Sequence, residues 1–331
     1  MKKVLVLPGD GIGPEVISAT VQAINILTDE IEFRTENIGL EYFREKGRAI
    51  PKSVINSITE YDAVLLGTIS DAPEEKGYRN PDIELAHILN LQTSVRQIKS
   101  IHPELGNMGV NAVMVSNNVH MTIIQEMDDV DGIMREISMP FDICRKICED
   151  AKLIALDSGR KKVTCIHGNH LFKNSDTKFM QIFYDVFSGS GLELENETVV
   201  DAVAKIASGK QDYDMIVTLE LYSKIIGDAL SAHMGGTYLT PIVDLGDDVA
   251  IFRPSHSENK QITSINYANP TASLLSGALM LEYFEMHDKA EILRDAVVSA
   301  YKRGYEPRDV GGEYGTFDFT DEIIRYCNNP M

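Results

Sequence analysis

Short apolar runs alternate with helical patterns from the start of the chain, and this alternation constrains the fold more than any other feature. Residues 3–7 and 63–67 are mainly apolar stretches, typical of strands buried on both faces. Between them, residues 14–27 carry apolar side chains at helical spacing, a short alternating stretch follows at 31–34, and a further helix is predicted near 55–60. This order of strands and helices predicts an α/β protein whose mostly parallel sheet is covered by helices on both faces.

The rest of the chain continues the pattern, with one exception. Residues 121–140 are acidic, rich in methionine and poorly periodic, and we interpret them as an arm or loop that packs against a partner subunit. No internal repeat or long linker is present, so two lobes would interleave along the sequence. Further strands are predicted over 112–115, 162–165, 214–218 and 250–252, and further helices over 141–156, 223–233, 270–287 and 290–303.

Composition limits the classes of partner. The chain has 331 residues, of which 44% are hydrophobic and 24% charged, as expected for a globular protein. With 31 Lys and Arg against 50 Asp and Glu, the formal net charge is −19, which repels nucleic acid and anionic membranes. We therefore expect neither as a partner. A small anionic substrate is not excluded, because it requires only a local basic pocket.

The cysteines and the lengths of the apolar runs indicate in which cellular compartment the protein is expected. No run approaches the ~18 apolar residues that cross a bilayer, and the first apolar run is too short for a signal peptide. Cys144 and Cys148 lie four residues apart, and neither Cys165 nor Cys327 belongs to a Cys-x-x-Cys motif. The sequence predicts a cytoplasmic protein with reduced, unliganded thiols.

A glycine-rich turn, Gly-Asp-Gly-Ile-Gly-Pro-Glu-Val at 9–16, connects the first predicted strand and helix. Glycines let the backbone approach a ligand closely, and a helix N-terminus favours negative charge, so Gly11 and Ile12 are candidate cofactor contacts. The turn is not the dinucleotide fingerprint, because Pro14 occupies the place of its third glycine. Taken alone, the turn is equally compatible with a tight connection that binds nothing.

The whole octet is more specific than its glycines, and it resembles the opening motif of the β-decarboxylating dehydrogenases, the isocitrate and 3-isopropylmalate dehydrogenase family. Further segments resemble the family in the same order along nearly the whole chain, namely 62–67, 77–79, 90–96, 161–165, 175–176, 214–218, 268–272 and 309–321. The resemblance implies a two-lobe isopropylmalate-dehydrogenase-like fold. Residues 1–91 and 236–331 are expected to form the cofactor-side lobe, and 92–235 the second lobe, with the dimer interface and a clasp arm near 121–140.

The resemblance also implies a chemistry. Members of the family are dimers that oxidise a 2-hydroxy acid with NAD or NADP and remove its β-carboxylate with the help of Mg²⁺ or Mn²⁺. Arginines hold the substrate carboxylates, because a guanidinium fork binds a carboxylate bidentately. Three aspartates hold the hard cation that polarises the keto oxygen, and a lysine and a tyrosine transfer protons.

Only part of the family's substrate clamp is carried over. Arg96 occupies the second arginine position, whereas the first falls on Ala86 and the third on Ser116. The tyrosine position falls near Ile123, and no tyrosine lies nearby. The resemblance therefore implies a clamp reduced to Arg96, the candidate contact for an acidic ligand.

The family's proton-transfer lysine is also missing. Its position falls on Gly168, which His167 and His170 flank. A histidine can replace a lysine acid at neutral pH, so His167 is a candidate catalytic residue. The alternative interpretation is that both histidines are solvated and have no catalytic role.

The metal positions are mixed. Asp201 and Asp228 match two of the three metal aspartates, while Lys224 occupies the remaining position, four residues before Asp228. An ammonium group there takes the place of the Mg²⁺ or Mn²⁺ ion. We favour an interpretation in which Lys224 pairs with Asp228 and with Asp201 of the partner subunit. Alternatively, Lys224 is a catalytic acid or base whose pKa is shifted by its surroundings.

The nucleotide segment is altered. His256 and Asn269 occupy the family's adenine-side positions. The glutamate that precedes this loop in the family falls on Arg253, and the acidic residue that would bind the NAD ribose falls on Gln261. The NADP-type pair of lysine and tyrosine is absent as well. NAD or NADP is the family expectation, and binding of adenine alone is also compatible with these residues.

Three functions follow as alternatives. The first is an NAD(P)-linked oxidoreductase with a changed substrate, and the second is a non-catalytic regulatory subunit or a sensor of a small acid or adenine nucleotide. Such a protein forms a homodimer or a hetero-oligomer with an active paralogue. The third is a different enzyme that holds zinc or a similar metal in a histidine-rich cleft. The simplest alternative to this third function is that scattered polar residues line a cleft that is not used. We predict no oxidation of isocitrate or isopropylmalate, because five positions of one pocket depart together, namely Ala86, Ser116, Gly168, Lys224 and Gln261. The candidate residues of the third alternative are His87, His120, His167 and His170.

Overall fold

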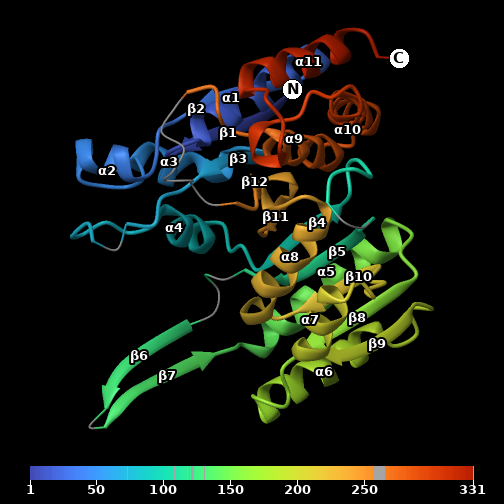
Figure 1. Ribbon diagram of the computed structural model, residues 1–331. Helices are drawn as coiled ribbons and strands as arrows, with labels where there is room; N and C mark the ends of the chain where they lie inside the picture. Colours follow the sequence, from blue (N-terminus) through green and yellow to red (C-terminus); the bar gives the residue numbers. More distant parts are fainter. Residues whose placement is uncertain are drawn as a thin grey trace.

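One ten-stranded sheet runs through the whole molecule (Figure 1). The computed structural model describes residues 1–72, 74–106, 109–118, 120, 123–129, 131–256 and 265–330. In spatial order, the strands are β2 (Ile31–Thr35), β1 (Lys2–Gly9), β3 (Ala63–Thr68), β12 (Ala250–Pro254), β11 (Pro241–Leu245), β4 (Thr93–Lys99), β5 (Asn111–Asn117), β10 (Met215–Thr218), β8 (Lys162–His167) and β9 (Glu193–Thr198).

The sheet is parallel at both ends and antiparallel in the centre. The strands from β2 to β12 pair in parallel, as do those from β5 to β9. The pairs β12–β11, β11–β4 and β4–β5 are antiparallel. The predicted mostly parallel sheet is confirmed, and its antiparallel centre is a feature that the sequence did not predict. The boundary between the two predicted lobes falls at the β11–β4 ladder, and the division itself stays a prediction.

Helices cover both faces of the sheet, as predicted. Successive side chains of a strand point to opposite faces, so Thr93 and Arg96 of β4 point in opposite directions. Thr93 donates a hydrogen bond to Asp150 at 2.6 Å, whereas Arg96 donates to Asp228 at 2.8 Å. Asp150 belongs to α5 (Phe141–Asp157) and Asp228 to α8 (Glu220–Met234), so these two helices lie on opposite faces.

The two helices predicted over 270–287 and 290–303 are both present, with a boundary earlier than expected. The first, α9, ends at Tyr283, and α10 begins at His287. Glu285 between them has a φ of +60°, in the left-handed region that ends a helix. Besides α5 and α8, the α-helices are α1 (Gly13–Leu27), α2 (Leu40–Lys46), α3 (Lys52–Ser57), α4 (Pro81–Ile88), α6 (Lys173–Phe187), α7 (Val199–Ala207), α9 (Thr271–Tyr283), α10 (His287–Lys302) and α11 (Thr316–Asn328).

The predicted arm contains an antiparallel hairpin. Strands β6 (Ile123–Asp129) and β7 (Gly132–Ser138) pair only with each other and extend away from the sheet, at the lower left of Figure 1. Ile133 of this hairpin is 71% exposed. The segment was predicted as an arm or loop because its poor periodicity hides the strands.

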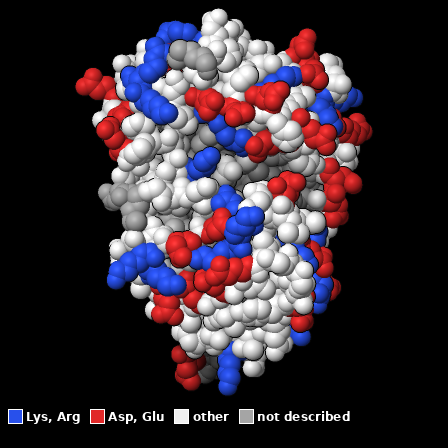
Figure 2. Space-filling view, turned by 90° about the vertical axis from the view of Figure 1, so that its right-hand side faces the viewer, with Lys and Arg blue, Asp and Glu red and all other residues white. Residues whose placement is uncertain are grey.

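The surface carries charges of both signs. On the face shown in Figure 2, Lys and Arg side chains are interspersed with Asp and Glu, and no continuous basic area covers it. Within the part of the chain that the structure describes, no helix is long and apolar enough to cross a membrane. The four cysteines are buried and form no disulfide.

Candidate functional site

A cleft of about 580 Å³ lies over the antiparallel centre of the sheet, on the face that α8 covers. The strand register explains how its floor is built. Ile242 of β11 is paired with Arg96 of β4 on one side and with Arg253 of β12 on the other. Paired residues on neighbouring strands point to the same face, so both arginines project into the cleft. Asp244, two residues after Ile242, points the same way and is paired with Ser94.

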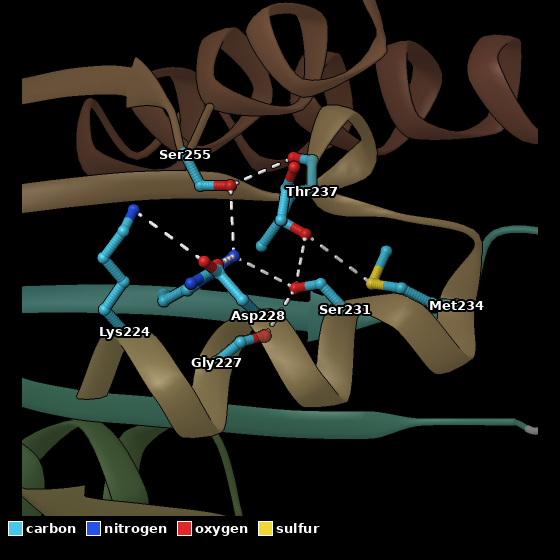
Figure 3. A network of polar contacts seen from close by, with 9 residues as sticks. Lys224, Gly227, Asp228, Ser231, Met234, Thr237 and Ser255 are labelled. Carbon is cyan, nitrogen blue, oxygen red and sulfur yellow. Dashed lines mark hydrogen bonds and ion pairs between the residues drawn. The ribbon is translucent and has the colours of Figure 1, made fainter. Parts of the chain in front are cut away.

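Arg96 is held in place by three oxygen atoms from two sides of the cleft (Figure 3). Its Nη2 donates hydrogen bonds to Asp228 at 2.8 Å and Ser231 at 3.1 Å, both on α8, and to Ser255 at 3.3 Å, which follows β12. The side chain is only 7% exposed, and this burial lowers the pKa of Arg96 from its ordinary value. A Cβ at Gly227 would lie 2.5 Å from Arg96 Nη1, so the glycine makes room for the guanidinium group.

A second arginine forms an ion-pair cluster at the other side of the cleft. Arg253 donates from Nε to Asp244 at 2.7 Å and from Nη1 to Asp82 of α4 at 3.2 Å. Burial opposes the charge of Arg253, but the two carboxylates together raise its pKa above the ordinary value. Sequence reasoning noted Arg253 only as an altered family position and missed both aspartates. The exchange of an acidic for a basic residue was the available signal, because a buried arginine needs acidic partners.

The predicted pair of Lys224 and Asp228 is present within the chain. The Lys224 Nζ lies 3.8 Å from Asp228 Oδ2, and its side chain is 81% exposed, so this contact is weaker than the bond from Arg96. Asp201 lies elsewhere, in the first turn of α7, where its backbone N–H donates to Thr198. Asp201 does not line the cleft of its own chain, and its predicted contact across a dimer stays a prediction.

The family's lysine position is filled by another side chain. A Cβ at Gly168 would lie 2.2 Å from the hydroxyl oxygen of Tyr222, a buried residue of α8. The Tyr222 hydroxyl donates to Asp176 Oδ2 at 2.7 Å, and the Gly168 N–H donates to the same oxygen at 2.6 Å. Burial and the bond to Asp176 raise the pKa of Tyr222. A neutral, buried phenol therefore occupies the space that a longer side chain at 168 would need.

The histidines do not gather around one point. His167 is 2% exposed, and its Nε2 lies 3.2 Å from the Asn196 side-chain oxygen, so the interpretation of His167 as solvated is wrong. His170 is exposed, as that interpretation expected. Of the four candidates, His120 lines the cleft described here, and burial lowers its pKa. No group of three or more potential metal ligands occurs among the described residues, so a zinc site within one chain is not supported.

The glycine-rich turn is fixed by acidic side chains. The Asp10 carboxylate accepts hydrogen bonds from the backbone N–H groups of Leu40, Glu41 and Ser70, which connect the turn to α2 and to the residues after β3. Gly11 is exposed with a φ of +57°, and the Ile12 side chain is 4% exposed. These contacts hold the turn as a connection, and the cofactor contacts of Gly11 and Ile12 stay a prediction.

The adenine-side candidates are buried and have protein partners. The Asn269 amide donates to Asp309 at 3.1 Å, and its oxygen accepts from the Thr271 N–H at 3.0 Å. The His256 ring lies 4.4 Å from the Tyr238 ring, measured between centroids, and the residue is 8% exposed. Gln261 lies outside the described residues. The structure thus positions both adenine-side residues through contacts within the chain.

Comparison with known proteins decides the family. The model of the isocitrate/isopropylmalate dehydrogenase family matches residues 3–323. The chain belongs to this family. Homoisocitrate dehydrogenase of Methanocaldococcus jannaschii is 31% identical, over 100% of this chain and 99% of the relative. A regulatory subunit of the mitochondrial NAD isocitrate dehydrogenase of Dictyostelium discoideum is 30% identical, over 100% of this chain and 93% of the relative.

Solved structures of the isocitrate/isopropylmalate dehydrogenase type agree with this assignment. Isocitrate dehydrogenase from Methylococcus capsulatus matches with a TM-score of 0.93 and 25% identity, over 99% of this chain and 100% of that one. The family and the fold expected from the resemblance are confirmed. Because the relatives include proteins named as enzymes and one named as a regulatory subunit, membership alone does not assign a reaction to this chain.

The metal-binding aspartates that one chain supplies do not fit the family's divalent cation. Mg²⁺ and Mn²⁺ require several oxygen ligands around one point. Here Asp228 accepts from Arg96 and faces Lys224, and Asp201 lies outside the cleft. Two cationic side chains of the cleft, Arg96 and Lys224, already contact Asp228, so the residues present favour an ion pair over a bound metal.

Proposed function

We propose that this chain is a ligand-binding member of the isocitrate/isopropylmalate dehydrogenase family whose own cleft does not support metal-assisted oxidative decarboxylation. One observation carries the proposal: Asp228 accepts a hydrogen bond from Arg96 and also faces Lys224, where the family chemistry requires free carboxylates. The phenol of Tyr222, which excludes a lysine at Gly168, supports it independently. Without the cation and the lysine, the keto oxygen is not polarised and no proton donor is in place.

The ligands we propose are a small acid and an adenine nucleotide. Arg96 supplies a guanidinium group in the cleft, and the buried His256 and Asn269 mark the adenine side. NAD, NADP, Mg²⁺ and Mn²⁺ remain family expectations for this chain. In this proposal the protein acts as a regulatory subunit or sensor in the cytoplasm, and its state changes when the acid or nucleotide binds.

We also propose that residues 1–91 and 236–331 form one lobe and 92–235 the other, and that a dimer is built on α7 and α8 of the second lobe. Four apolar side chains are exposed on these neighbouring helices: Val200, Val203, Leu221 and Ile225, at 59%, 36%, 41% and 56%. Exposed apolar side chains on adjacent helices favour an interface with a second copy. An active paralogue in place of the second copy gives the hetero-oligomeric form, in line with the regulatory subunit named among the relatives.

A direct assay tests the loss of catalysis. Purified protein is mixed with NAD or NADP, with isocitrate, 3-isopropylmalate or homoisocitrate, and with Mg²⁺ or Mn²⁺. We expect no reduced nicotinamide above the background without protein, while the homoisocitrate dehydrogenase of Methanocaldococcus jannaschii serves as the positive control. In parallel, a bound acid or adenine nucleotide at 100 times its Kd should stabilise the fold by about 2.7 kcal/mol. Metal-dependent production of NADH or NADPH would contradict the proposal.

A second candidate is an oxidoreductase whose proton transfer depends on His120. The imidazole lines the cleft, and burial lowers its pKa, so it is neutral at pH 7 and able to accept a proton. The same assay separates the two candidates. Reduction of NAD or NADP that needs no divalent cation, and that is lost in His120→Asn, would favour this second function.

A further inference from the structure

The two sides of the cleft differ in the hydrogen-bonding groups they leave unpaired. On one side, the Asp244 side chain is 2% exposed, and its Oδ1 has no hydrogen-bond partner among the described residues. Oδ1 of Asp82 is unpaired in the same way. On the other side, Arg96 Nε is a buried donor without a partner in the described part of the chain. A buried polar atom that lacks a partner is unfavourable, so these three atoms mark where a ligand can add bonds.

The charges follow the same division. Two carboxylates, Asp82 and Asp244, share the single guanidinium group of Arg253, which leaves that side with an excess of negative charge. His120 faces this side, and its lowered pKa means that it adds no positive charge at neutral pH. On the opposite side, Arg96 and Lys224 share Asp228.

Glu220 also lines the cleft, and burial raises the pKa of its carboxyl group. Asp71 lines it as well. Neither residue contributes an unpaired buried atom within the described structure. The acceptor side is therefore defined by Asp82 and Asp244, and the donor side by Arg96.

The spacing of the two sides suits a small molecule. Asp244 is paired with Ser94, and Arg96 follows Ser94 by two residues on the same strand. Asp244 and Arg96 are thus diagonal neighbours on one face of the sheet, about 7–8 Å apart at the backbone. An ammonium group and a carboxylate carried by one small ligand can each reach a partner of opposite charge across this distance.

We propose that the cleft binds a small amino acid as a zwitterion, with its ammonium group against Asp244 and Asp82 and its carboxylate against Arg96. The inference rests on the proposed function, because it names the acid that a non-catalytic cleft would bind. A 2-hydroxy acid fits less well, since a hydroxyl group has one proton to donate and no positive charge. An ammonium group donates three hydrogen bonds and compensates the excess negative charge.

Matched pairs of ligands test the proposal. Binding of L-aspartate is compared with that of L-malate, and L-glutamate with L-2-hydroxyglutarate, by calorimetry on the full chain. Within each pair the two compounds differ only in the amino or hydroxyl group. We expect the amino acid to bind about ten-fold more tightly or better, which is the scale of one charge-assisted hydrogen bond. Asp244→Asn should abolish this preference, and Asp82→Asn should reduce it.

The control is Asp247→Asn, which removes an exposed carboxylate that lies outside the cleft and bonds Asn90. It should leave the preference unchanged. If Asp244→Asn does not fold because Arg253 loses its partner, Asp82→Asn alone decides the matter. Equal or tighter binding of the hydroxy acids, failure of every compound to bind, or a preference that survives both variants would overturn the inference. Equal or tighter binding of the hydroxy acids without turnover overturns the inference alone, whereas production of NADH or NADPH contradicts the proposed function.

Discussion

Position 168 has no side chain, and Tyr222 fills the space that a side chain would occupy. A Cβ there would lie 2.2 Å from the Tyr222 oxygen, which leaves no room even for a methyl group. We expect Gly168→Ala to lower the free energy of unfolding by about 1–3 kcal/mol, because overpacking forces the ring and its bond to Asp176 to shift. Chemical denaturation measures the change.

Gly109→Ala is the matched control, since nothing lies within 4 Å of a Cβ there and its φ is not positive. Its stability should change by less than about 0.5 kcal/mol. The double variant Gly168→Ala with Tyr222→Leu should recover part of the loss of the single variant, relative to Tyr222→Leu alone. A Gly168→Ala protein as stable as the control would show that Tyr222 does not fill this space.

At single positions, the sequence predicted which family residues are changed, but not which distant side chains now fill their space or pair with them. The absence of a lysine at Gly168 follows from the motif alone. Tyr222 lies 54 positions later, and only the packing of α8 against the end of β8 brings the two together. Arg253 was noticed as an exchanged residue, yet its partners Asp82 and Asp244 come from distant segments that carry no shared motif.

At the scale of elements, Glu15 of α1 connects three segments. Its carboxylate accepts hydrogen bonds from the backbone N–H groups of Asn266 at 2.9 Å, Tyr267 at 3.1 Å and Ala268 at 3.2 Å. It also accepts from the Thr316 hydroxyl group at the start of α11. The loop that leads to Asn269 is therefore fixed by one charged side chain.

Glu15→Gln should lower the free energy of unfolding by about 2 kcal/mol, because an amide offers one acceptor oxygen and turns a donor toward backbone N–H groups. Binding of AMP or ADP should weaken as the loop loosens. Denaturant unfolding and calorimetry measure the two effects. Glu32→Gln, an exposed glutamate of β2, is the control. Equal stability of the two variants would mean that the loop is held by its other contacts.

The elements that were predicted well are those whose environment is uniform. Strands β1 and β3 are buried on both faces and appear in the sequence as apolar runs. Strand β4, Thr-Ser-Val-Arg-Gln-Ile-Lys, is also central, yet one of its faces carries the polar residues of the cleft. The site therefore interrupts the apolar pattern at the centre of the sheet: β5 and β12 were predicted from their apolar runs, whereas β4 was recognised only through family resemblance and β11 was missed.

At the scale of the whole molecule, the continuous sheet places the cleft where its strand direction changes. Parallel strands on both sides meet at the antiparallel group of β12, β11, β4 and β5. Side chains from distant segments of the sequence thus converge on one surface, although β4 and β12 are separated by about half of the chain. No local motif records such a convergence, which explains why the ion pairs of the cleft could not be predicted.

The apolar side chains of α7 and α8 provide the test of assembly. Ile225 is 56% exposed in the single chain, so Ile225→Glu should leave the fold of that chain intact while placing a charge in the proposed interface. We expect sedimentation velocity to show a dimer for the unmodified protein and the mass of one chain for the variant, with unchanged circular dichroism. Leu153→Glu on α5, an apolar residue that is 67% exposed outside these helices, should stay dimeric. A dimer that persists in Ile225→Glu but dissociates in Leu153→Glu would place the interface on the opposite side of the second lobe. In that case Asp201 of the partner subunit could not reach Lys224, and the ion pairs of Asp228 with Arg96 and Lys224 would be complete within one chain.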